Sequence, residues 1–286
     1  MAQGTVVTRD TSDRRQRITG MLQEQGSVQV LPLSQQFRVS SQTIRKDLQY
    51  LEGRGVATRC YGGAILSQIV GPASEPPFEI KRTLRADEKD SIGRFAASLV
   101  KPGDSIVLDS GTTTAYIARH LADDEDITVV TNDAGVLAEL MGKKHIQIVM
   151  LGGSLRRKNM AFYGAQTEAA MDELLVDKLF LGVDGFELEN GITTHFEPEA
   201  MLNRRMVKRA RQVIAVTDGS KFGRTCMHRI VDVRDLTMLI TDASAPAAIV
   251  DGTRAMGVAV EVLPESGLPT DGPNLANPSK AFALTQ

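Results

Sequence analysis

Short apolar runs alternate with longer amphipathic segments through most of the chain. The runs are SIVLD, ITVVTN, IQIVMLGG, KLFLGVDG, QVIAVTD, LTMLITD and VAVEVL. Nearly continuous β-branched runs are typical of strands covered on both faces, and the segments between them, such as TTAYIARHLAD, have helical periodicity. The alternation therefore predicts an α/β fold with a mainly parallel sheet.

The first part of the chain follows a different pattern. DRRQRITGMLQEQG and LPLSQQFRV each place their apolar residues on one helical face. In QTIRKDLQYLEGRG, the residues Ile44, Leu48 and Leu51 recur at helical spacing. VATRCYGGAIL then alternates like a small hairpin. Three short helices followed by a hairpin predict a winged helix–turn–helix domain.

Shifts in composition mark the domain boundaries. SQIVGPASEPP is rich in proline, glycine and serine, which is typical of a linker. The end of the chain, GLPTDGPNLANPSKAFALTQ, has the composition of a disordered tail. We predict a winged helix–turn–helix domain over 10–66, a linker over 67–77, an α/β domain over 78–265 and a disordered tail over 266–286.

The third helix of the first domain leaves polar side chains on its outer face: Ser41, Gln42, Thr43, Arg45, Lys46 and Gln49. Glutamine and arginine suit the edges of adenine and guanine, so this face is a candidate for reading bases. In the hairpin, Arg59 and Tyr61 are candidates for contacts with DNA phosphates. The alternative is a generic three-helix packing module whose outer face is only solvated.

Charge favours the DNA-binding interpretation. The first 66 residues carry nine Lys and Arg against five Asp and Glu, whereas the whole chain has a net charge of −2. A basic domain on an acidic body indicates a polyanionic partner.

Composition also limits the location of the protein. The chain has 286 residues and 42% hydrophobic content, enough for two domains with cores. It lacks an apolar run that would span a membrane, and its first residues lack the apolar core of a signal peptide. Cys60 and Cys226 lie far apart without a CxxC motif. We therefore predict a cytoplasmic protein without a membrane partner.

Polar residues follow the apolar runs of the second domain where each predicted strand ends. In an open α/β sheet, ligands bind beyond the carboxyl ends of the strands, so these residues are expected to converge. The candidates are Asp109, Ser110, Gly111, Thr112, Thr113, Thr131, Asn132, Gly152, Gly153, Asp184 and Lys221.

The segment VLDSGTTT is a candidate phosphate site. Backbone N–H groups and hydroxyls at the start of a helix bind anions, and three consecutive threonines exceed what a helix cap needs. Asp109, Asn132 and Asp184 would bind sugar hydroxyls, glycines 152 and 153 would allow close backbone approach, and Lys221 would add positive charge. Helix capping remains the alternative for the threonines, and a turn role for Asp184.

Two further patterns are given plainer interpretations. His195, Glu197 and Glu199 alternate in THFEPE, which would suit a metal, but we predict a polar strand or loop at the rim of the ligand site. NRRMVKRAR is interpreted as a solvated helix face. No metal or other cofactor is expected.

The segment SVQVLPLSQQFRVSSQTIRKDLQYLEGRGVATRCYGGA resembles the winged helix–turn–helix of DeoR-family transcriptional regulators. The resemblance continues to about residue 265 through SGTTT, FYG, LFLGVD and THFEPEAMLNRRM. These elements are especially similar to those of repressors of N-acetylgalactosamine utilisation operons. The resemblance implies a dimeric or tetrameric regulator that binds double-stranded operator DNA and is released by a phosphorylated sugar, with an amino-sugar phosphate as the best candidate.

The second domain also resembles ribose-5-phosphate isomerase, whose phosphate loop is matched by residues 110–113. Asp184 matches the second Asp of the isomerase DGADE motif, but Leu181 replaces the first, which is catalytic. Thr193 and Thr194 lie where the isomerase lysine is expected, and Glu199 is a candidate for its glutamate. Without the Asp and the Lys, proton transfer between sugar carbons lacks its acid and base. The loop is therefore expected to detect a sugar phosphate rather than to transform it.

Two alternatives stay open at this point. The first is a sugar-phosphate isomerase or deaminase with an accessory DNA-binding domain. The second is an activator instead of a repressor, because whether a bound regulator represses or activates transcription depends on where the operator lies relative to the promoter.

Overall fold

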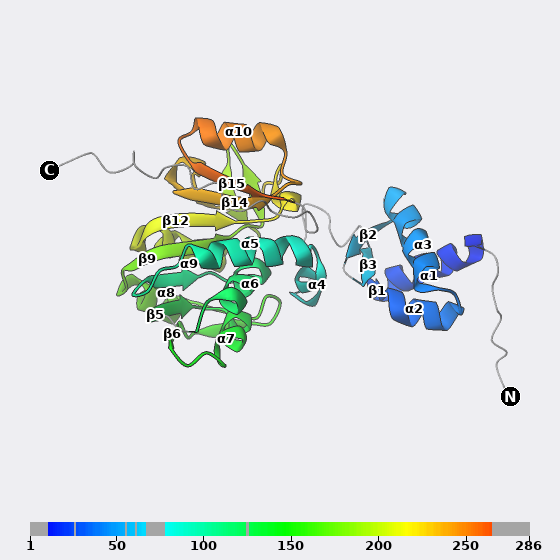
Figure 1. Ribbon diagram of the computed structural model, residues 1–286, viewed down its shortest axis with the longest axis horizontal. Coiled ribbons are helices and arrows are strands. Elements are labelled where there is room, and N and C mark those ends of the chain that lie inside the picture. The colour runs from blue at the N-terminus through cyan, green and yellow to red at the C-terminus, as the bar shows by residue number, and fades with distance from the viewer. Residues whose placement is uncertain are drawn as a thin grey trace.

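The computed structural model describes residues 11–25, 27–54, 56–60, 62–66, 78–123 and 126–264, which form an N-terminal helical domain and a larger α/β domain (Figure 1). The predicted linker, the predicted tail and Tyr61 lie outside the described residues. The division into these segments stays a prediction.

The N-terminal domain has the arrangement of a winged helix–turn–helix. Its elements are α1 (Thr11–Gln25), β1 (Ser27–Gln29), α2 (Val30–Phe37), α3 (Ser41–Gly53), β2 (Ala57–Cys60) and β3 (Gly63–Leu66). The strands form an antiparallel sheet in the order β1-β3-β2. Helix α2 ends because Arg38 adopts a left-handed conformation, and Ser40 caps α3 by accepting the backbone N–H of Thr43 at 3.1 Å.

The core of this domain follows the apolar pattern of the sequence. Ile44, Leu48 and Leu51 of α3 are buried against Ile18 and Leu22 of α1 in one hydrophobic cluster. The same spacing turns the opposite face of α3 outward. The predicted three-helix arrangement with a hairpin wing is thus confirmed.

The α/β domain is built on one parallel sheet. Its elements are α4 (Phe78–Thr83), α5 (Ala86–Ser98), β4 (Ser105–Leu108), α6 (Thr112–His120), β5 (Ile127–Thr131), α7 (Ala134–Leu140), β6 (Ile146–Met150), β7 (Ser154–Arg156), β8 (Ala161–Tyr163), α8 (Ala165–Asp172), β9 (Val176–Gly182), β10 (Gly185–Glu187), β11 (Gly191–Thr194), α9 (Glu197–Arg209), β12 (Ala210–Val216), η2 (Gly219–Lys221), β13 (His228–Val231), η3 (Val233–Asp235), β14 (Met238–Asp242), α10 (Ala247–Ala255) and β15 (Ala259–Leu263). The sheet has the order β15-β14-β12-β9-β4-β5-β6, and its neighbouring strands are parallel.

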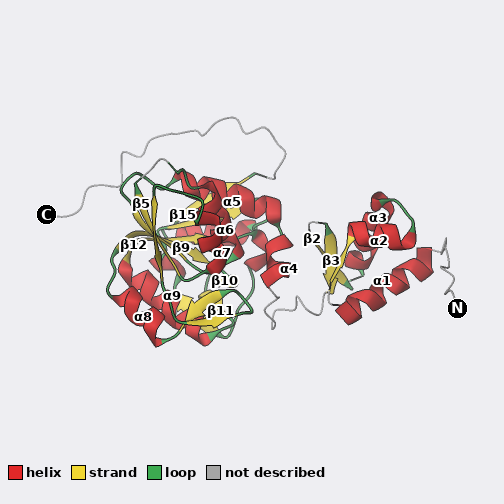
Figure 2. Ribbon diagram, turned by 90° about the horizontal axis from the view of Figure 1, so that it is seen from below, coloured by secondary structure: helices red, strands yellow, loops and turns green. Residues whose placement is uncertain are grey.

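Helices cover both faces of this sheet, with α5, α6 and α7 on one side and α8 and α9 on the other (Figure 2). Ile106 and Leu108 of β4 belong to the cluster under α5–α7, whereas Val107 between them belongs to the cluster under α8 and α9. Strands buried on both faces need apolar residues at every position, which explains the continuous runs in the sequence. The predicted α/β fold with a parallel sheet is confirmed.

The order of the strands places a crevice at the centre of the sheet. From β4 the chain continues outward through β5 and β6, and then returns to the other side of β4 with β9. The loops that follow β4 and β9 therefore diverge to opposite faces, which leaves space at the carboxyl ends of these two strands.

Candidate functional site

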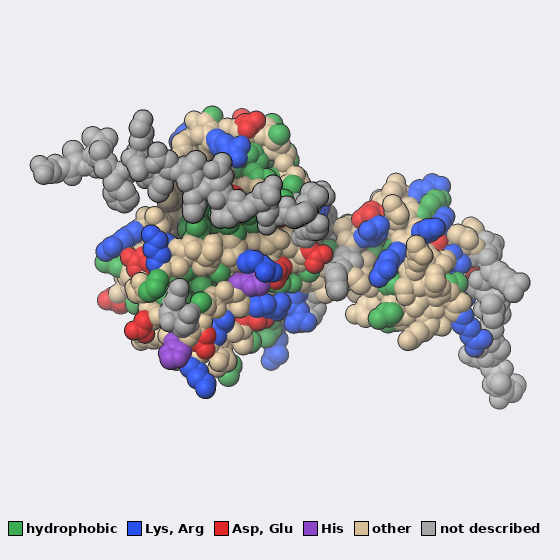
Figure 3. Space-filling model, viewed as in Figure 1, with side chains coloured by type: hydrophobic (Ala, Val, Ile, Leu, Met, Phe, Trp, Pro, Cys, Tyr) green, Lys and Arg blue, Asp and Glu red, His purple; other side chains and the backbone are tan. Residues whose placement is uncertain are grey.

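Helix α3 presents the polar surface that the sequence predicts. Gln42, Arg45, Lys46 and Gln49 are exposed, and Ser41 is half-buried next to them. Thr43 is also half-buried, and its hydroxyl lies 2.9 Å from that of the capping residue Ser40. Lys and Arg side chains are prominent on the visible surface of this domain (Figure 3). A DNA-facing role for these residues stays a prediction.

The wing carries Arg59 on β2 with its side chain half-exposed. Its guanidinium Nε lies 3.7 Å from a carboxylate oxygen of Glu52, and its backbone N–H donates to the other oxygen at 3.0 Å. Glu52 therefore joins the wing to the end of α3.

A buried ion cluster that the sequence did not reveal holds α3 against α1. Asp47 is 1% exposed and accepts hydrogen bonds from Nε of Arg14 at 2.6 Å and from Nε of Arg15 at 2.8 Å. The guanidinium of Arg15 also lies 3.9 Å from the centre of the Tyr50 ring. Two cations on one carboxylate fix how the outer face of α3 projects from the domain. The signal in the sequence is an Asp between Ile44 and Leu48, on the apolar face of the helix.

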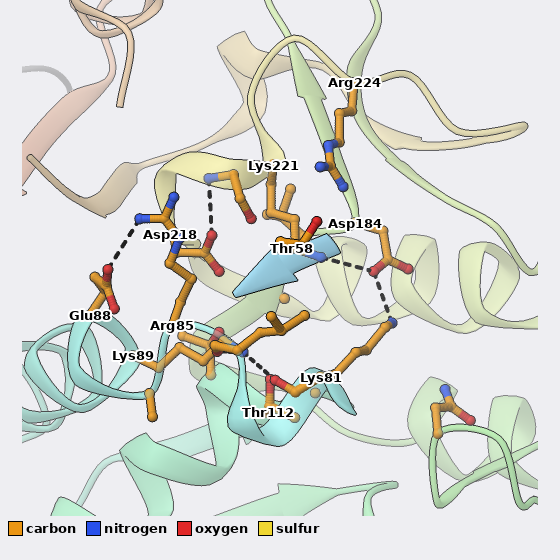
Figure 4. Close-up of a pocket in the computed structure, with 18 of the residues that line it drawn as sticks. Thr58, Lys81, Arg85, Glu88, Lys89, Thr112, Asp184, Asp218, Lys221 and Arg224 are labelled. Atoms are coloured by element: carbon orange, nitrogen blue, oxygen red, sulfur yellow. Dashed lines mark hydrogen bonds and ion pairs between the residues drawn. The ribbon is translucent and has the colours of Figure 1, made fainter. Parts of the chain in front are cut away.

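A cavity of about 620 Å³ opens at the carboxyl ends of the central strands, where the strand order reverses. Figure 4 shows side chains that line it. Of the predicted ligand-binding residues, the cavity is lined by Ser110, Gly111, Thr112, Thr113, Asp184, Glu199 and Lys221. Further lining residues come from α4, α5, the turn between these helices and the loop after β12, among them Lys81, Arg85, Lys89 and Asp218. Glu52, Thr58 and Arg59 of the N-terminal domain also line it.

The loop between β4 and α6 prepares an anion site. The backbone N–H of Ser110 donates to the carboxylate of Asp109 at 2.6 Å, and that of Gly111 donates to Asp133 at 3.2 Å. The helix then begins at Thr112, and Gly111 has no side chain with which to cap it. The first N–H groups of α6 therefore have no side-chain cap from the preceding residue, and Thr112 and Thr113, which carry them, line the cavity.

Two buried carboxyl groups hold the loop between β4 and α6 by accepting hydrogen bonds from its backbone. Asp109 is 1% exposed and also accepts from the N–H of Gly182 at 3.2 Å and from Nδ2 of Asn203 at 3.1 Å. Burial raises the pKa of Asp109 to about 7, against the effect of the backbone N–H groups that it accepts. Asp133 caps α7 through the N–H groups of residues 135 and 136, and burial raises its pKa to about 6. The structure thus places Asp109 under the loop rather than among the residues that line the cavity.

Asp184 lies between two lysines (Figure 4). Its Oδ1 is 3.1 Å from Nζ of Lys81 and 3.8 Å from Nζ of Lys221, and its other oxygen accepts from the hydroxyl of Thr194 at 3.2 Å. Burial alone would raise the pKa of Asp184, but the two lysine charges outweigh it and hold the pKa well below the usual value. Asp184 is therefore an ionised acceptor that keeps both lysines at the cavity.

Three cations come from a segment that sequence reasoning passed over, KRTLRADEK. Lys89 is buried and donates to the carbonyl oxygens of Lys81 at 2.6 Å and Leu84 at 2.7 Å, and burial lowers its pKa to about 8. Arg85 is left-handed with φ of 52° and donates to Glu88 at 3.1 Å. The signal for these cations in the sequence is the series of basic residues before a helix. Nothing in that series indicates that it lies close to the VLDSGTTT loop.

Other predicted ligand-binding residues lie outside the cavity lining. The hydroxyl of Thr131 donates to the carbonyl of Leu108 at 2.8 Å, and Nδ2 of Asn132 donates to that of Phe162 at 3.0 Å. Glycines 152 and 153 pack against the hydroxyl of Thr167, and glycine 153 also packs against the backbone of residue 163. The hydroxyl of Thr193 accepts the N–H of Cys226 at 2.9 Å. These residues hold neighbouring segments together.

Neither a metal cluster nor a membrane helix occurs in the part of the chain that the structure describes. It contains no group of three or more His, Cys, Asp or Glu side chains that could hold a metal ion. His195 lies instead with its Nε2 3.4 Å from the sulfur of Cys226. None of the described helices is long and apolar enough to cross a membrane.

Comparison with known families decides what this combination of domains is. Residues 14–70 match the DeoR-like helix-turn-helix domain, and residues 84–243 match the DeoR C-terminal sensor domain. The chain belongs to the DeoR family. It is accordingly a DNA-binding transcriptional regulator with a C-terminal sensor domain, as the resemblance in its sequence indicated.

Its relatives include proteins named as repressors. A protein of Escherichia coli O157:H7 named for repression of the aga operon is 44% identical over 89% of this chain and 95% of its own length. The transcriptional repressor GlcR of Bacillus subtilis is 36% identical over 75% of this chain and 82% of its own length. The glycerol-3-phosphate regulon repressor of Escherichia coli K12 is 29% identical over 83% of this chain and 93% of its own length.

Solved structures resemble parts of the chain. Ribose 5-phosphate isomerase A from Methanocaldococcus jannaschii is 21% identical, with a TM-score of 0.35 over 47% of this chain and 53% of the isomerase chain. The full-length sorbitol operon regulator SorC from Klebsiella pneumoniae is 10% identical, with a TM-score of 0.33 over 75% of this chain and 91% of that chain.

Proposed function

We propose that this regulator represses a sugar or amino-sugar catabolic operon and leaves its operator when a phosphorylated sugar enters the cavity. The observation that carries the proposal is the meeting of an uncapped helix start with three lysines, Lys81, Lys89 and Lys221, in one cavity. A helix N-terminus and ammonium groups together favour a phosphate.

In this proposal the phosphate lies at Thr112 and Thr113, and the sugar extends toward Asp184. The ionised carboxylate of Asp184 accepts hydrogen bonds from sugar hydroxyls, while its two lysines neutralise its charge. An amino-sugar phosphate is the first effector to test, because a relative of 44% identity is named for the aga operon.

The cavity detects its ligand rather than transforming it. Leu181 lies fully buried in the core, where it offers no acid or base. The hydroxyls of Thr193 and Thr194 hydrogen-bond within the protein, and they could not replace a catalytic lysine. The rival from another class, an isomerase or deaminase with an accessory DNA-binding domain, predicts consumption of the sugar phosphate.

A homo-oligomer, a dimer or a tetramer, completes the proposal. A single recognition helix reads few base pairs, so specific binding needs at least two copies and an operator with matching symmetry or repetition. The protein would act in the cytoplasm, where both operator DNA and phosphorylated sugars occur.

A titration of operator binding against a panel of sugar phosphates tests the proposal. At least one compound is expected to weaken operator binding about 5- to 150-fold, which corresponds to a coupling of about 1–3 kcal/mol. The same compound is expected to raise the melting temperature, because it binds the folded state. Steady turnover of a panel compound would favour the enzyme instead, and tighter operator binding in its presence would contradict release.

A further inference from the structure

An amide, Asn159, and a carboxylate, Glu199, line the cavity together with Ser110. Asn159 lies in the loop between β7 and β8, and Glu199 lies in the first turn of α9. This part of the wall therefore differs in chemistry from the part formed by α4 and α5.

A chain of hydrogen bonds fixes the amide of Asn159. Its Nδ2 donates to the hydroxyl oxygen of Tyr163 at 2.6 Å, and that oxygen lies 2.9 Å from the hydroxyl of Ser110. Asn159 is only 7% exposed, yet its carbonyl Oδ1 has no hydrogen-bond partner among the described residues. This oxygen has almost no accessible surface and no donor, which is costly, so we expect a ligand that brings a donor to draw the amide toward the cavity by a small rotation.

Glu199 adds a carboxylate to the same part of the cavity wall. It is 8% exposed and lies in the first turn of α9, where the helix dipole interacts favourably with a negative charge. Burial and then the negative charge of Glu199 raise the pKa of Tyr163 well above its usual value. Tyr163 consequently stays a neutral hydroxyl, and the charge of Glu199 acts close to it.

We propose that Asn159 and Glu199 form a subsite that recognises the free amino group of an amino-sugar phosphate. This inference rests on the proposed function and specifies its ligand. An ammonium group has three donors and no acceptor, so it satisfies an amide carbonyl and a carboxylate together, and its bonds to the carboxylate are charge-assisted. A hydroxyl brings one donor and no charge. An N-acetyl group loses the charge and adds a carbonyl that meets two acceptors.

Isothermal titration of the full-length protein tests the subsite. The probes are the 6-phosphates of glucosamine and galactosamine, of their N-acetyl derivatives, and of glucose and galactose. At least one amine is expected to bind about 10-fold or more tightly than both its parent sugar phosphate and its N-acetyl derivative. Because this comparison uses only the unaltered protein, it does not depend on how any variant folds.

A pair of variants then tests whether the preference for the amine depends on Glu199. Glu199→Gln is expected to bring the ratio of amine to parent affinity to within about 3-fold of unity, because it removes the charge but keeps the shape. Glu197→Gln removes the same charge from the same helix turn at a residue that does not line the cavity, and is expected to retain the wild-type ratio.

The outcomes separate this inference from the proposed function. Binding of the phosphates with equal affinity for amine and parent would overturn the subsite and leave the sugar-phosphate sensor in place. An amine preference that survives Glu199→Gln would also overturn it. Binding of none of the probes, together with no response to other sugar phosphates, would refute the proposed function and the subsite with it.

Discussion

Both domains bury an aspartate, and they give it different partners. In the N-terminal domain, Asp47 is held by the guanidinium groups of Arg14 and Arg15. In the α/β domain, the donors to Asp109 among the described residues are backbone N–H groups and the amide of Asn203, and burial raises its pKa to about 7. The ion pairs of Asp47 fix the position of α3, whose outer face remains exposed. The N–H and amide donors to Asp109 instead fix the loop between β4 and α6, and none of these donors is a cation.

The contrast extends to how each domain would recognise its partner. Helix α3 offers exposed side chains such as Arg45, which can meet base edges without rearrangement of the domain. The cavity instead offers groups that already hydrogen-bond to one another, such as Asp184 with Lys81. A ligand there must compete with existing pairs, and that competition is a means by which its binding can change the state of the protein.

The largest expected effect comes from removing the buried charge in the N-terminal domain. Asp47→Ala leaves two guanidinium groups without their carboxylate, and breaking a buried ion pair costs about 3–5 kcal/mol. We expect the amides of α1 and α3 to lose most of their protection in hydrogen exchange, and operator binding to fail. Protection in the α/β domain serves as the internal control. Unchanged protection in α1 and α3 would show that the ion cluster does not hold these helices together.

An effect of comparable size is expected from pH in the α/β domain. Because the folded-state pKa of Asp109 is raised to about 7, and that of Asp133 to about 6, the folded chain takes up protons before the unfolded chain does. The free energy of unfolding should therefore rise as pH falls from about 8 to about 5, by at most about 1.4 kcal/mol per pH unit for each proton.

Asp109→Asn isolates this contribution. Denaturant unfolding of the variant is expected to depend less on pH over that window than unfolding of the unaltered protein. The pKa values of Asp184 and Asp218 are lowered, so their contribution to the free energy of unfolding is lost only below the unfolded-state pKa of about 3.9. Their effect therefore lies outside the pH window in which Asp109 acts. An identical slope in the variant would remove Asp109 from this explanation.

The threonine loop gives the next prediction. Thr113→Val keeps the size of the side chain but removes a hydroxyl that lines the cavity. Losing a hydrogen bond to a charged phosphate costs about 1.5–3 kcal/mol, so effector affinity should fall about 10- to 100-fold while operator binding persists. The result would be a repressor that does not respond to the effector.

Operator titrations with and without effector, together with a melting curve, distinguish the alternatives for this loop. A pure capping role predicts lower stability with unchanged effector affinity. A catalytic role predicts lost turnover. Normal release in a folded Thr113→Val protein would exclude the hydroxyl from phosphate binding.

On the predicted DNA-binding surface, Arg45→Ala is expected to weaken operator binding by about 1–3 kcal/mol and to relax preference at one base position. The fold should be unaffected, because Arg45 is exposed on the side of α3 away from Ile44, Leu48 and Leu51. Selection from a randomised operator library measures both effects. Unchanged affinity and preference would remove Arg45 from the base-reading face.

The smallest effect is expected in the wing. Arg59→Ala should lower affinity about equally for all DNA sequences and reduce the slope of log K against log salt by about one. Arg59 also pairs with Glu52, so part of its charge is already compensated. A loss confined to the true operator would indicate base reading instead, and no change at any salt concentration would indicate an arginine without DNA contact.

The sequence by itself determined the elements and their types. The spacing of Ile44, Leu48 and Leu51 predicted both the buried and the exposed face of α3, because a helix repeats every 3.6 residues. Continuous apolar runs predicted a sheet covered on both faces, and polar residues after those runs predicted a site at the carboxyl ends of the strands. The predictions of the helix faces and of the covered sheet are confirmed because they depend only on neighbours along the chain, whereas the ligand site stays a prediction.

Only the tertiary structure decided which of those polar residues share a cavity. Thr131 and Asn132 lie at the carboxyl end of β5, as Ser110 lies at that of β4, yet they bind neighbouring backbone, because β5 lies on the far side of β4 from β9. Lys81 enters the site through the packing of α4, and Asn159 through the loop between β7 and β8. The partners of a buried charge lie far away along the chain, so no local pattern specifies them.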